Sequence, residues 1–115
     1  MIKPNIPAYI LPHLVSIQAK RVETDALGGR VEAWSTVLTD QRAFIQPLSQ
    51  AEIAASQQRD DYRTTHRIYL GKLPIRPTPQ HRITFGSRIF SVVSATDQGE
   101  LGVLWELEAE ETTPR

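Results

Sequence analysis

The chain has 115 residues, in which 13 Lys and Arg balance 13 Asp and Glu, and it contains no cysteine. A chain of this length is expected to fold as one domain, and the lack of cysteine excludes disulfide scaffolds, thiolate zinc sites and cysteine nucleophiles. Zero net charge disfavours a free-standing nucleic-acid binder, which usually carries a basic surface. No apolar run approaches the ~20 residues of a membrane-spanning helix.

Prolines and period-two alternation organise the chain. Three prolines before residue 13 predict an extended N-terminal arm over 1–13, ahead of one β domain at 14–110 and a C-terminal tail at 111–115. Tight turns are expected at 28–29 and 86–87, where glycine occurs. The alternating segments that predict strands are 15–19, 31–37, 42–48, 64–70, 83–85, 89–95 and 101–110. The expected fold is all-β: a small antiparallel β-barrel or sandwich of about six or seven strands, with one long loop that carries a short helix.

Residues 49–63 are expected to form this long loop. The stretch from Ser49 to Glu52 matches a capping box, in which the Ser hydroxyl and the Glu carboxylate bond free backbone N–H groups reciprocally. The residues that follow favour a helix, but Ile53 is the one large apolar side chain before residue 59, so the helix has little to bury. Long connections of this kind are either functional or disordered.

Charge is unevenly spread along the chain. Residues 1–95 carry 12 Lys and Arg against 7 Asp and Glu (+5), whereas residues 96–115 carry 1 against 6 (−5). This split fits a head-to-tail contact between copies, the kind that closes rings, and it fits a solvated face equally well. The acidic candidates for such a contact are Glu106, Glu108 and Glu110. The basic candidates are Arg63, Arg67, Arg82 and Arg88.

A search for catalytic or ligand-binding patterns finds no site. The histidines at 13, 66 and 81 lack the spacing of a zinc protease, and His66 shares a strand face with Ile68, which favours a packed or edge histidine over a metal ligand. Asp60 and Asp61 point in opposite directions on an extended segment, so they form no acid–base pair. No catalytic residue, metal ligand or cofactor is therefore predicted. A barrel that binds single-stranded nucleic acid through stacking aromatics is a remote alternative.

Taken in order, several segments resemble the phage head–tail joining family, the small head-completion or stopper proteins of long-tailed bacteriophages. The matching segments are residues 14–18, Asp25 to Gly29 followed by Trp34, the run Ala43-Phe44-Ile45-Gln46-Pro47-Leu48-Ser49, residues 65–68, and residues 82–93 with Asp97. They span about residues 14 to 109, and their order and spacing carry the resemblance. The proline-rich start and the proline-rich link at 74–79 depart from the family pattern.

The resemblance implies a structural protein rather than an enzyme, with no cofactor and no membrane partner. Such proteins form a ring, usually a dodecamer, beneath the portal and adaptor in the neck of the virion. They close the DNA-filled head and present the surface to which the tail terminator or other tail proteins attach from below, and double-stranded DNA passes through their channel without sequence-specific binding. Assembly in the cytoplasm of the bacterial host is expected. The alternative within the same particle is a tail-completion or tail-terminator ring protein.

Two interaction surfaces follow for this chain. The long loop is expected to contact neighbouring subunits, the adaptor or the channel through Ser49, Glu52, Ile53, Arg59, Tyr62 and Arg63. A charge-paired contact between subunits is expected to join Glu106, Glu108 and Glu110 with Arg67, Arg82 and Arg88.

Overall fold

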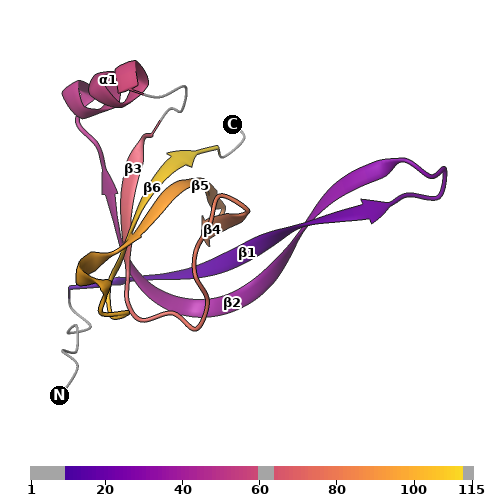
Figure 1. Cartoon of the computed structure of the whole chain (residues 1–115), viewed down its shortest axis with the longest axis horizontal. Helices are drawn as coiled ribbons and strands as arrows, with labels where there is room; N and C mark the ends of the chain where they lie inside the picture. The colour runs from indigo at the N-terminus through magenta and orange to yellow at the C-terminus, as the bar shows by residue number, and fades with distance from the viewer. Residues whose placement is uncertain (1–9, 60–63, 113–115) are drawn as a thin grey trace.

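The computed structural model describes residues 10–59 and 64–112. The elements in chain order are β1 (His13–Thr24), β2 (Arg30–Pro47), α1 (Gln50–Arg59), β3 (His66–Leu70), β4 (His81–Phe85), β5 (Arg88–Asp97), the 3-10 turn η1 (Gln98–Glu100) and β6 (Trp105–Glu111). Figure 1 shows the strands wrapped around one another, with α1 and the β1–β2 hairpin projecting from them in different directions.

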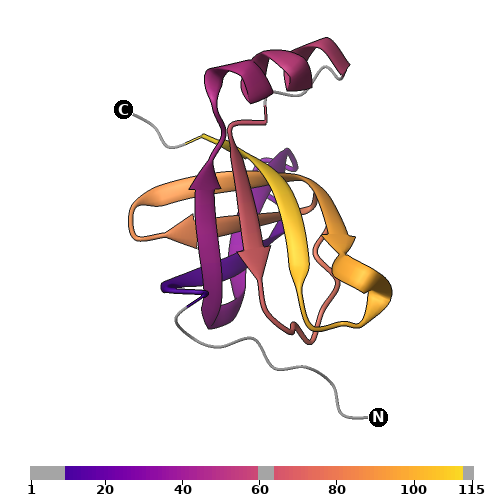
Figure 2. The same ribbon diagram turned by 90° about the vertical axis from the view of Figure 1, so that its left-hand side faces the viewer.

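The strands form one antiparallel sheet that closes on itself in the order β1-β2-β3-β6-β5-β4. Closure comes from β1 and β4, which pair from Ser16 opposite Thr84 to Ala19 opposite His81. Figure 2 looks at the side on which β2, β3 and β6 lie next to one another, with β4 and β5 behind them. The predicted all-β, antiparallel class with one helix-bearing excursion is confirmed.

The core lies inside the barrel and takes alternate residues from every strand. In β6, Trp105, Leu107 and Ala109 face inward while Glu106 and Glu108 face outward, as the alternation predicts. His66 also faces the interior and is almost completely buried, which agrees with the prediction of a packed histidine. The apolar side chains of the core are Val15, Ile17, Ala43, Ile45, Ile68, Leu70, Ile83, Phe90, Val92, Trp105, Leu107 and Ala109.

The structure joins two predicted strands into one. Residues 31–37 and 42–48 were expected to be separate, but β2 runs without interruption for 18 residues. Its first part pairs with β1 and its last part with β3, and two register shifts opposite Val15–Gln18 bend it from one partner to the other. Asp40 has a positive φ of 53° within this bend. Because each bulge adds one residue, the alternation changes phase twice, and this hides the continuity of the strand from a period-two analysis.

The last strand begins later than its alternation predicts. Residues 101–104 were expected to belong to it, yet β6 starts at Trp105. Gly102 has a positive φ of 71°, and its N–H donates to Oδ1 of Asp97 at 3.0 Å. This closes a turn instead of extending the sheet, and it leaves Leu101 exposed.

The described part of the chain begins shortly before β1 and ends shortly after β6. Residues 1–9 of the expected N-terminal arm lie outside the described residues, whereas Leu11 is buried and His13 begins β1. β6 continues to Glu111, and residues 113–115 of the expected tail are likewise outside the description.

The β1–β2 hairpin continues well beyond the barrel. β1 pairs with β4 only as far as Ala19, so residues 20–34 form a two-stranded projection, which we call the hairpin extension. Its turn is held by Asp25, whose Oδ1 accepts the N–H groups of Leu27 and Gly29 at 2.9 and 2.7 Å. Gly28 supplies the positive φ of 83° that this turn requires. Figure 1 shows the extension reaching away from the rest of the molecule.

Truncating a core leucine should destabilise the protein far more than truncating an exposed one. Leu107 is fully buried, whereas Leu27 at the tip of the hairpin extension is 96% exposed. We expect Leu107→Ala to lower the free energy of unfolding by about 2–5 kcal/mol, because it removes buried contacts and leaves a cavity. Leu27→Ala is the matched control and should change it by less than about 0.5 kcal/mol in urea denaturation. Equal effects of the two variants would contradict the described packing.

Candidate functional site

The segment that follows β2 is attached to one end of the barrel. The Leu48 N–H donates to the Thr65 carbonyl at 3.0 Å, which joins the two ends of the excursion. The predicted capping box is present: the Ser49 N–H donates to Oε1 of Glu52, and the Glu52 N–H donates to Oγ of Ser49, each at 3.2 Å. Figures 1 and 2 show α1 standing clear of the sheet above this point.

Glu52 links the helix electrostatically to the barrel. The hydrogen bonds from Ser49 hold the pKa of Glu52 below its usual value, and the nearby Arg67 lowers it further. Nη1 of Arg67 lies 3.6 Å from Oε2 of Glu52. Ile53 is partly exposed, so the one large apolar side chain at the start of the helix is only incompletely covered. This leaves residues 50–55 of α1 available for contacts with other molecules.

Not every residue predicted for this surface lies in the described part of the chain. Arg59 is the last residue of α1, and its side chain is outside the description. Tyr62 and Arg63 fall in residues 60–63, which are also outside it.

Glu106 is the centre of a polar cluster on the outer face of β3 and β6. Its Oε1 lies 3.0 Å from Nε of Arg67 and accepts the hydroxyl of Tyr69 at 3.2 Å. Its Oε2 accepts the side-chain amide of Gln98 at 2.6 Å. Burial raises the pKa of Tyr69, and the Glu106 carboxylate raises it further. The cluster ties the α1 segment, β3, η1 and β6 together within one subunit.

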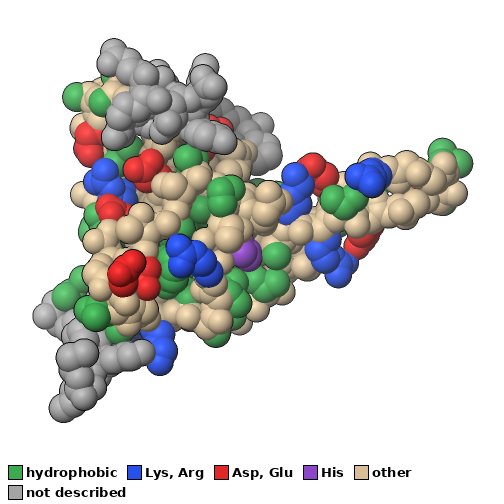
Figure 3. Space-filling view, in the orientation of Figure 1, with side chains coloured by type: hydrophobic (Ala, Val, Ile, Leu, Met, Phe, Trp, Pro, Cys, Tyr) green, Lys and Arg blue, Asp and Glu red, His purple; other side chains and the backbone are tan. Residues whose placement is uncertain are grey.

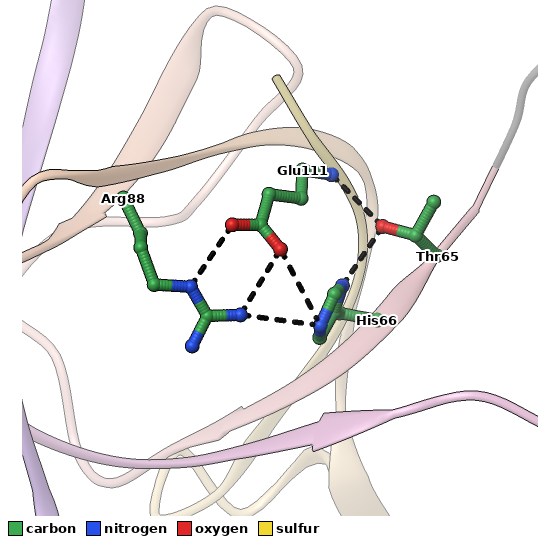
Figure 4. A network of polar contacts seen from close by, with 4 residues as sticks. All are labelled: Thr65, His66, Arg88 and Glu111. Carbon is green, nitrogen blue, oxygen red and sulfur yellow. Dashed lines mark hydrogen bonds and ion pairs between the residues drawn. The ribbon is translucent and has the colours of Figure 1, made fainter. Parts of the chain in front are cut away.

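A second polar network closes the end of the barrel near α1 (Figure 4). Nε and Nη2 of Arg88 donate to the two carboxylate oxygens of Glu111 at 2.9 and 3.0 Å, a bidentate arrangement. Oγ1 of Thr65 accepts the Glu111 N–H at 2.9 Å and lies 2.8 Å from Nδ1 of His66. Because Oγ1 already accepts that N–H, its own proton is free to be donated to Nδ1. Nε2 of His66 lies 3.5 Å from Nη2 of Arg88 and 3.8 Å from Oε1 of Glu111.

Arg82 has its partners at the base of the hairpin extension. Its Nε donates to Oε1 of Gln18 at 2.6 Å. Its guanidinium carbon lies 4.3 Å from the centroid of the Trp34 ring, a cation–π arrangement. These contacts bind the root of the extension to β4.

The structure therefore brings together only some of the residues predicted for a charged interface. Arg67 pairs with Glu106 inside the subunit, and Arg88 pairs with Glu111, a residue that the prediction did not include. Glu108 and Glu110 lie on the outward face of β6 and make no ion pair with the residues that the structure describes. Of the three acidic residues predicted for the interface, Glu108 and Glu110 are therefore the two that remain available to another molecule.

Two features escaped sequence reasoning. The four-residue network at the barrel end joins residues that are far apart in the chain, and only the strand pairing brings them together. The sequence carries a signal for the outer part of the hairpin extension, since residues 20–24 and 30–32 are polar except for Val22 and Val31. A strand without an apolar face has no core to cover.

Charges of both signs are interspersed over the surface that Figure 3 shows, and a hydrophobic side chain caps the tip of the hairpin extension. Within the described residues, no three His, Asp or Glu side chains are grouped as metal ligands. Among the helices described, none is long and apolar enough to cross a membrane.

The pKa of His66 should lie below that of a free histidine, because burial disfavours the charged ring and Arg88 adds to this effect. The Glu111 carboxylate raises the same pKa, so Glu111→Gln should lower it further. Glu110→Gln, on the opposite face of β6, is the matched control and should leave it unchanged. An NMR titration of the imidazole protons measures all three values. A normal pKa in the unchanged protein would contradict the described burial.

The same shift makes stability depend on pH. Histidine in the unfolded chain has the higher pKa, about 6.5, so the unfolded state binds more protons as the pH falls. His66 therefore contributes stability above about pH 6.5, and this contribution is lost as the pH drops towards the folded-state pKa. Urea midpoints at about pH 7.5 and about pH 5 should differ less for His66→Gln than for the unchanged protein.

Comparison with known proteins gives a consistent assignment. The family model for the phage head completion protein matches residues 6–112. A search of curated protein sequences gives no match. Among solved structures, the fold is similar to protein SF1141 from Shigella flexneri 2a, with a TM-score of 0.68 and 19% identity, over 91% of this chain and 96% of that one.

A chain in the virion of a native gene transfer agent particle is also similar, with a TM-score of 0.57 and 17% identity, over 89% of this chain and 96% of that one. At such identities the structural likeness concerns the fold alone, whereas the family model spans the whole barrel and the segment that carries α1. This protein belongs to the phage head completion protein family.

Proposed function

We propose that this protein forms a ring beneath the portal and adaptor of a DNA-filled phage head, closes that head, and provides the surface to which the tail attaches. The observation that carries the proposal is the family match over residues 6–112, which gives the chain a structural head-completion role. The likeness to a chain of the gene transfer agent virion supports a place in an assembled particle. Twelve copies are the expected number, and packaged double-stranded DNA passes through the channel.

The shape of the subunit supports a ring more than a compact oligomer. The barrel is closed and its core is complete within one chain, so the subunit does not need a partner in order to fold. Two projections, the α1 segment and the hairpin extension, are left for contacts with other molecules. A subunit of this kind stays monomeric in isolation and assembles on the portal and adaptor as its template.

Particles made without this protein test the proposed role. If the protein closes the head, its loss should leave separate, finished tails and heads that have released their DNA. Adding the purified protein to such heads should restore DNA retention and tail joining. Electron microscopy and protection of DNA from nuclease measure both outcomes. Tails of irregular length, with full heads, would show instead that the protein is a tail terminator.

We propose further that residues 49–63 contact neighbouring subunits, the adaptor or the channel. The described part of this segment supports the proposal, because the helix is anchored by its cap and by Glu52 to Arg67 while residues 50–55 are exposed or only partly buried. Trypsin should therefore cut at Arg59 or Arg63 more than about tenfold faster in the free protein than in assembled particles, because ordering in the ring protects the backbone. Equal rates in the two states would contradict the proposal.

Glu108 and Glu110 are proposed to face a basic surface of an adjoining subunit or ring. The double variant Glu108→Gln/Glu110→Gln should leave the urea midpoint of the free protein unchanged and reduce the salt concentration at which particles lose DNA, since exposed ion pairs contribute only ~0–1 kcal/mol and are screened by salt. Glu106→Gln is the matched control: it breaks contacts inside the subunit and should lower the urea midpoint. An unchanged salt tolerance of particles carrying the double variant would show that the two carboxylates are merely solvated.

A further inference from the structure

The hairpin extension carries two free strand edges, one on β1 and one on β2. Within the barrel, each strand has a neighbour on both sides. In the hairpin extension, residues 20–24 pair only with residues 30–34, and no other described strand pairs with either outer edge. Two rows of backbone N–H and C=O groups therefore face outward, one on β1 and one on β2. Exposed edges of this kind are templates for pairing with another strand.

The direction of the backbone groups at these edges follows from one hydrogen bond. The Lys20 N–H donates to the Gln80 carbonyl at 2.9 Å, on the side of β1 that faces away from β2. Because the direction alternates along a strand, the N–H of Val22 also points away from β2, to the free edge. Glu32 lies directly opposite Val22. Residues opposite each other in an antiparallel pair both point inward or both point outward, so the Glu32 N–H faces the other free edge.

The side chains of the hairpin extension allow close contact between copies. Val22 and Val31 are 59% and 45% exposed, so apolar surface is present beside both free edges. The charges balance within residues 20–34, with three basic residues (Lys20, Arg21, Arg30) and three acidic ones (Glu23, Asp25, Glu32). Nζ of Lys20 and Oε1 of Glu32 already pair across the two strands at 2.8 Å. Repeated copies placed side by side therefore accumulate no net charge.

Two of the devices that protect an exposed edge, proline and the β-bulge, are missing from residues 20–34. These residues contain no proline, and the register from Gln18 opposite Thr36 to Thr24 opposite Arg30 is regular, without a bulge. Prolines, bulges, very short strands and charged side chains all keep an edge from pairing, and of these the extension carries the charges, which are balanced in sign. An edge with a regular register, no proline and no bulge is open to pairing with a strand whose charges complement its own.

We propose that the β1 edge of the hairpin extension pairs, antiparallel, with the β2 edge of the extension in a second copy of this chain. The two edges of the extension have the same number of strand residues, their outward N–H groups lie at opposed positions, and the charges of the extension balance, so the extension of a second copy is a complementary partner. Pairing of β1 with β2 is heterologous, because two different edges meet. Each added copy therefore presents one free β1 edge and one free β2 edge at the ends of the assembly, until the last copy pairs with the first and closes the ring. The inference rests on the proposed ring and names the contact that holds neighbouring subunits together.

Proline substitutions test the edges directly. Val22→Pro and Glu32→Pro each remove an outward N–H, and neither removes a hydrogen bond within the hairpin. We expect each variant to fold normally by circular dichroism and urea denaturation, and to reduce the number of particles that retain DNA by about tenfold or more. Val22→Thr and Glu32→Gln are the matched controls, which keep the N–H and should retain wild-type yield. Normal yield with either proline variant would overturn the proposal.

Cross-linking tests which edges meet, independently of how the proline variants fold. The chain has no cysteine, so Val22→Cys and Glu32→Cys each carry a single thiol. In particles assembled from an equal mixture of the two, a short bifunctional thiol reagent should yield mixed dimers, and neither variant alone should yield dimers. Dimers from Val22→Cys alone would show a two-fold contact and overturn the proposal. The absence of any dimer would overturn it as well.

The failure of this contact and the failure of the proposed role give different results. If the variants enter particles and the heads retain DNA, but no mixed dimer forms, the ring stands and the proposed contact is wrong. If the unchanged protein is absent from purified heads, the proposed role and this contact are both wrong.

Discussion

The pairing of β1 with β4 decides the architecture of this protein. These strands are distant in sequence, and the pairing between residues 16–19 and 81–84 turns an open antiparallel sheet into a closed one. Closure lets alternate residues of every strand meet in one core, in which Ile17 and Ile83 lie opposite each other and are fully buried. It also sets where the hairpin extension begins, because β1 has no second neighbour beyond Ala19.

Polar contacts join the strands on the outer face and at one end of the barrel, which the apolar core does not reach. Glu106 joins β6 to β3 and η1 on the outer face, and the Arg88–Glu111 pair joins β5 to β6 at the end of the barrel. Within the described residues, every buried side-chain nitrogen or oxygen has a hydrogen-bond partner. Partners matter there because an unsatisfied buried polar group costs ~1–3 kcal/mol.

Much of the fold could be predicted from local patterns, and the exceptions have physical causes. Alternation located the buried faces of β3 and β6 because successive side chains in these strands point in turn to the core and to the outer surface. It failed in β2, where two bulges change the phase, and at residues 101–104, where Asp97 captures the Gly102 N–H. The capping box was predicted correctly because all of its hydrogen bonds join residues within one turn.

The sequence by itself determined the all-β class, the turn positions and the helix start, since these depend on side-chain alternation and on residues close together in the chain. It also contained the order of segments by which the family is recognised. Only the tertiary structure decided which charges are satisfied within the subunit: Arg67 and Arg88 are paired inside it, whereas Glu108 and Glu110 are left facing outward. The tertiary structure likewise decided that the β1–β2 hairpin extends beyond the barrel. Both outcomes depend on which distant strands become neighbours, and pairing between distant strands is set by closure of the whole sheet and not by any local pattern.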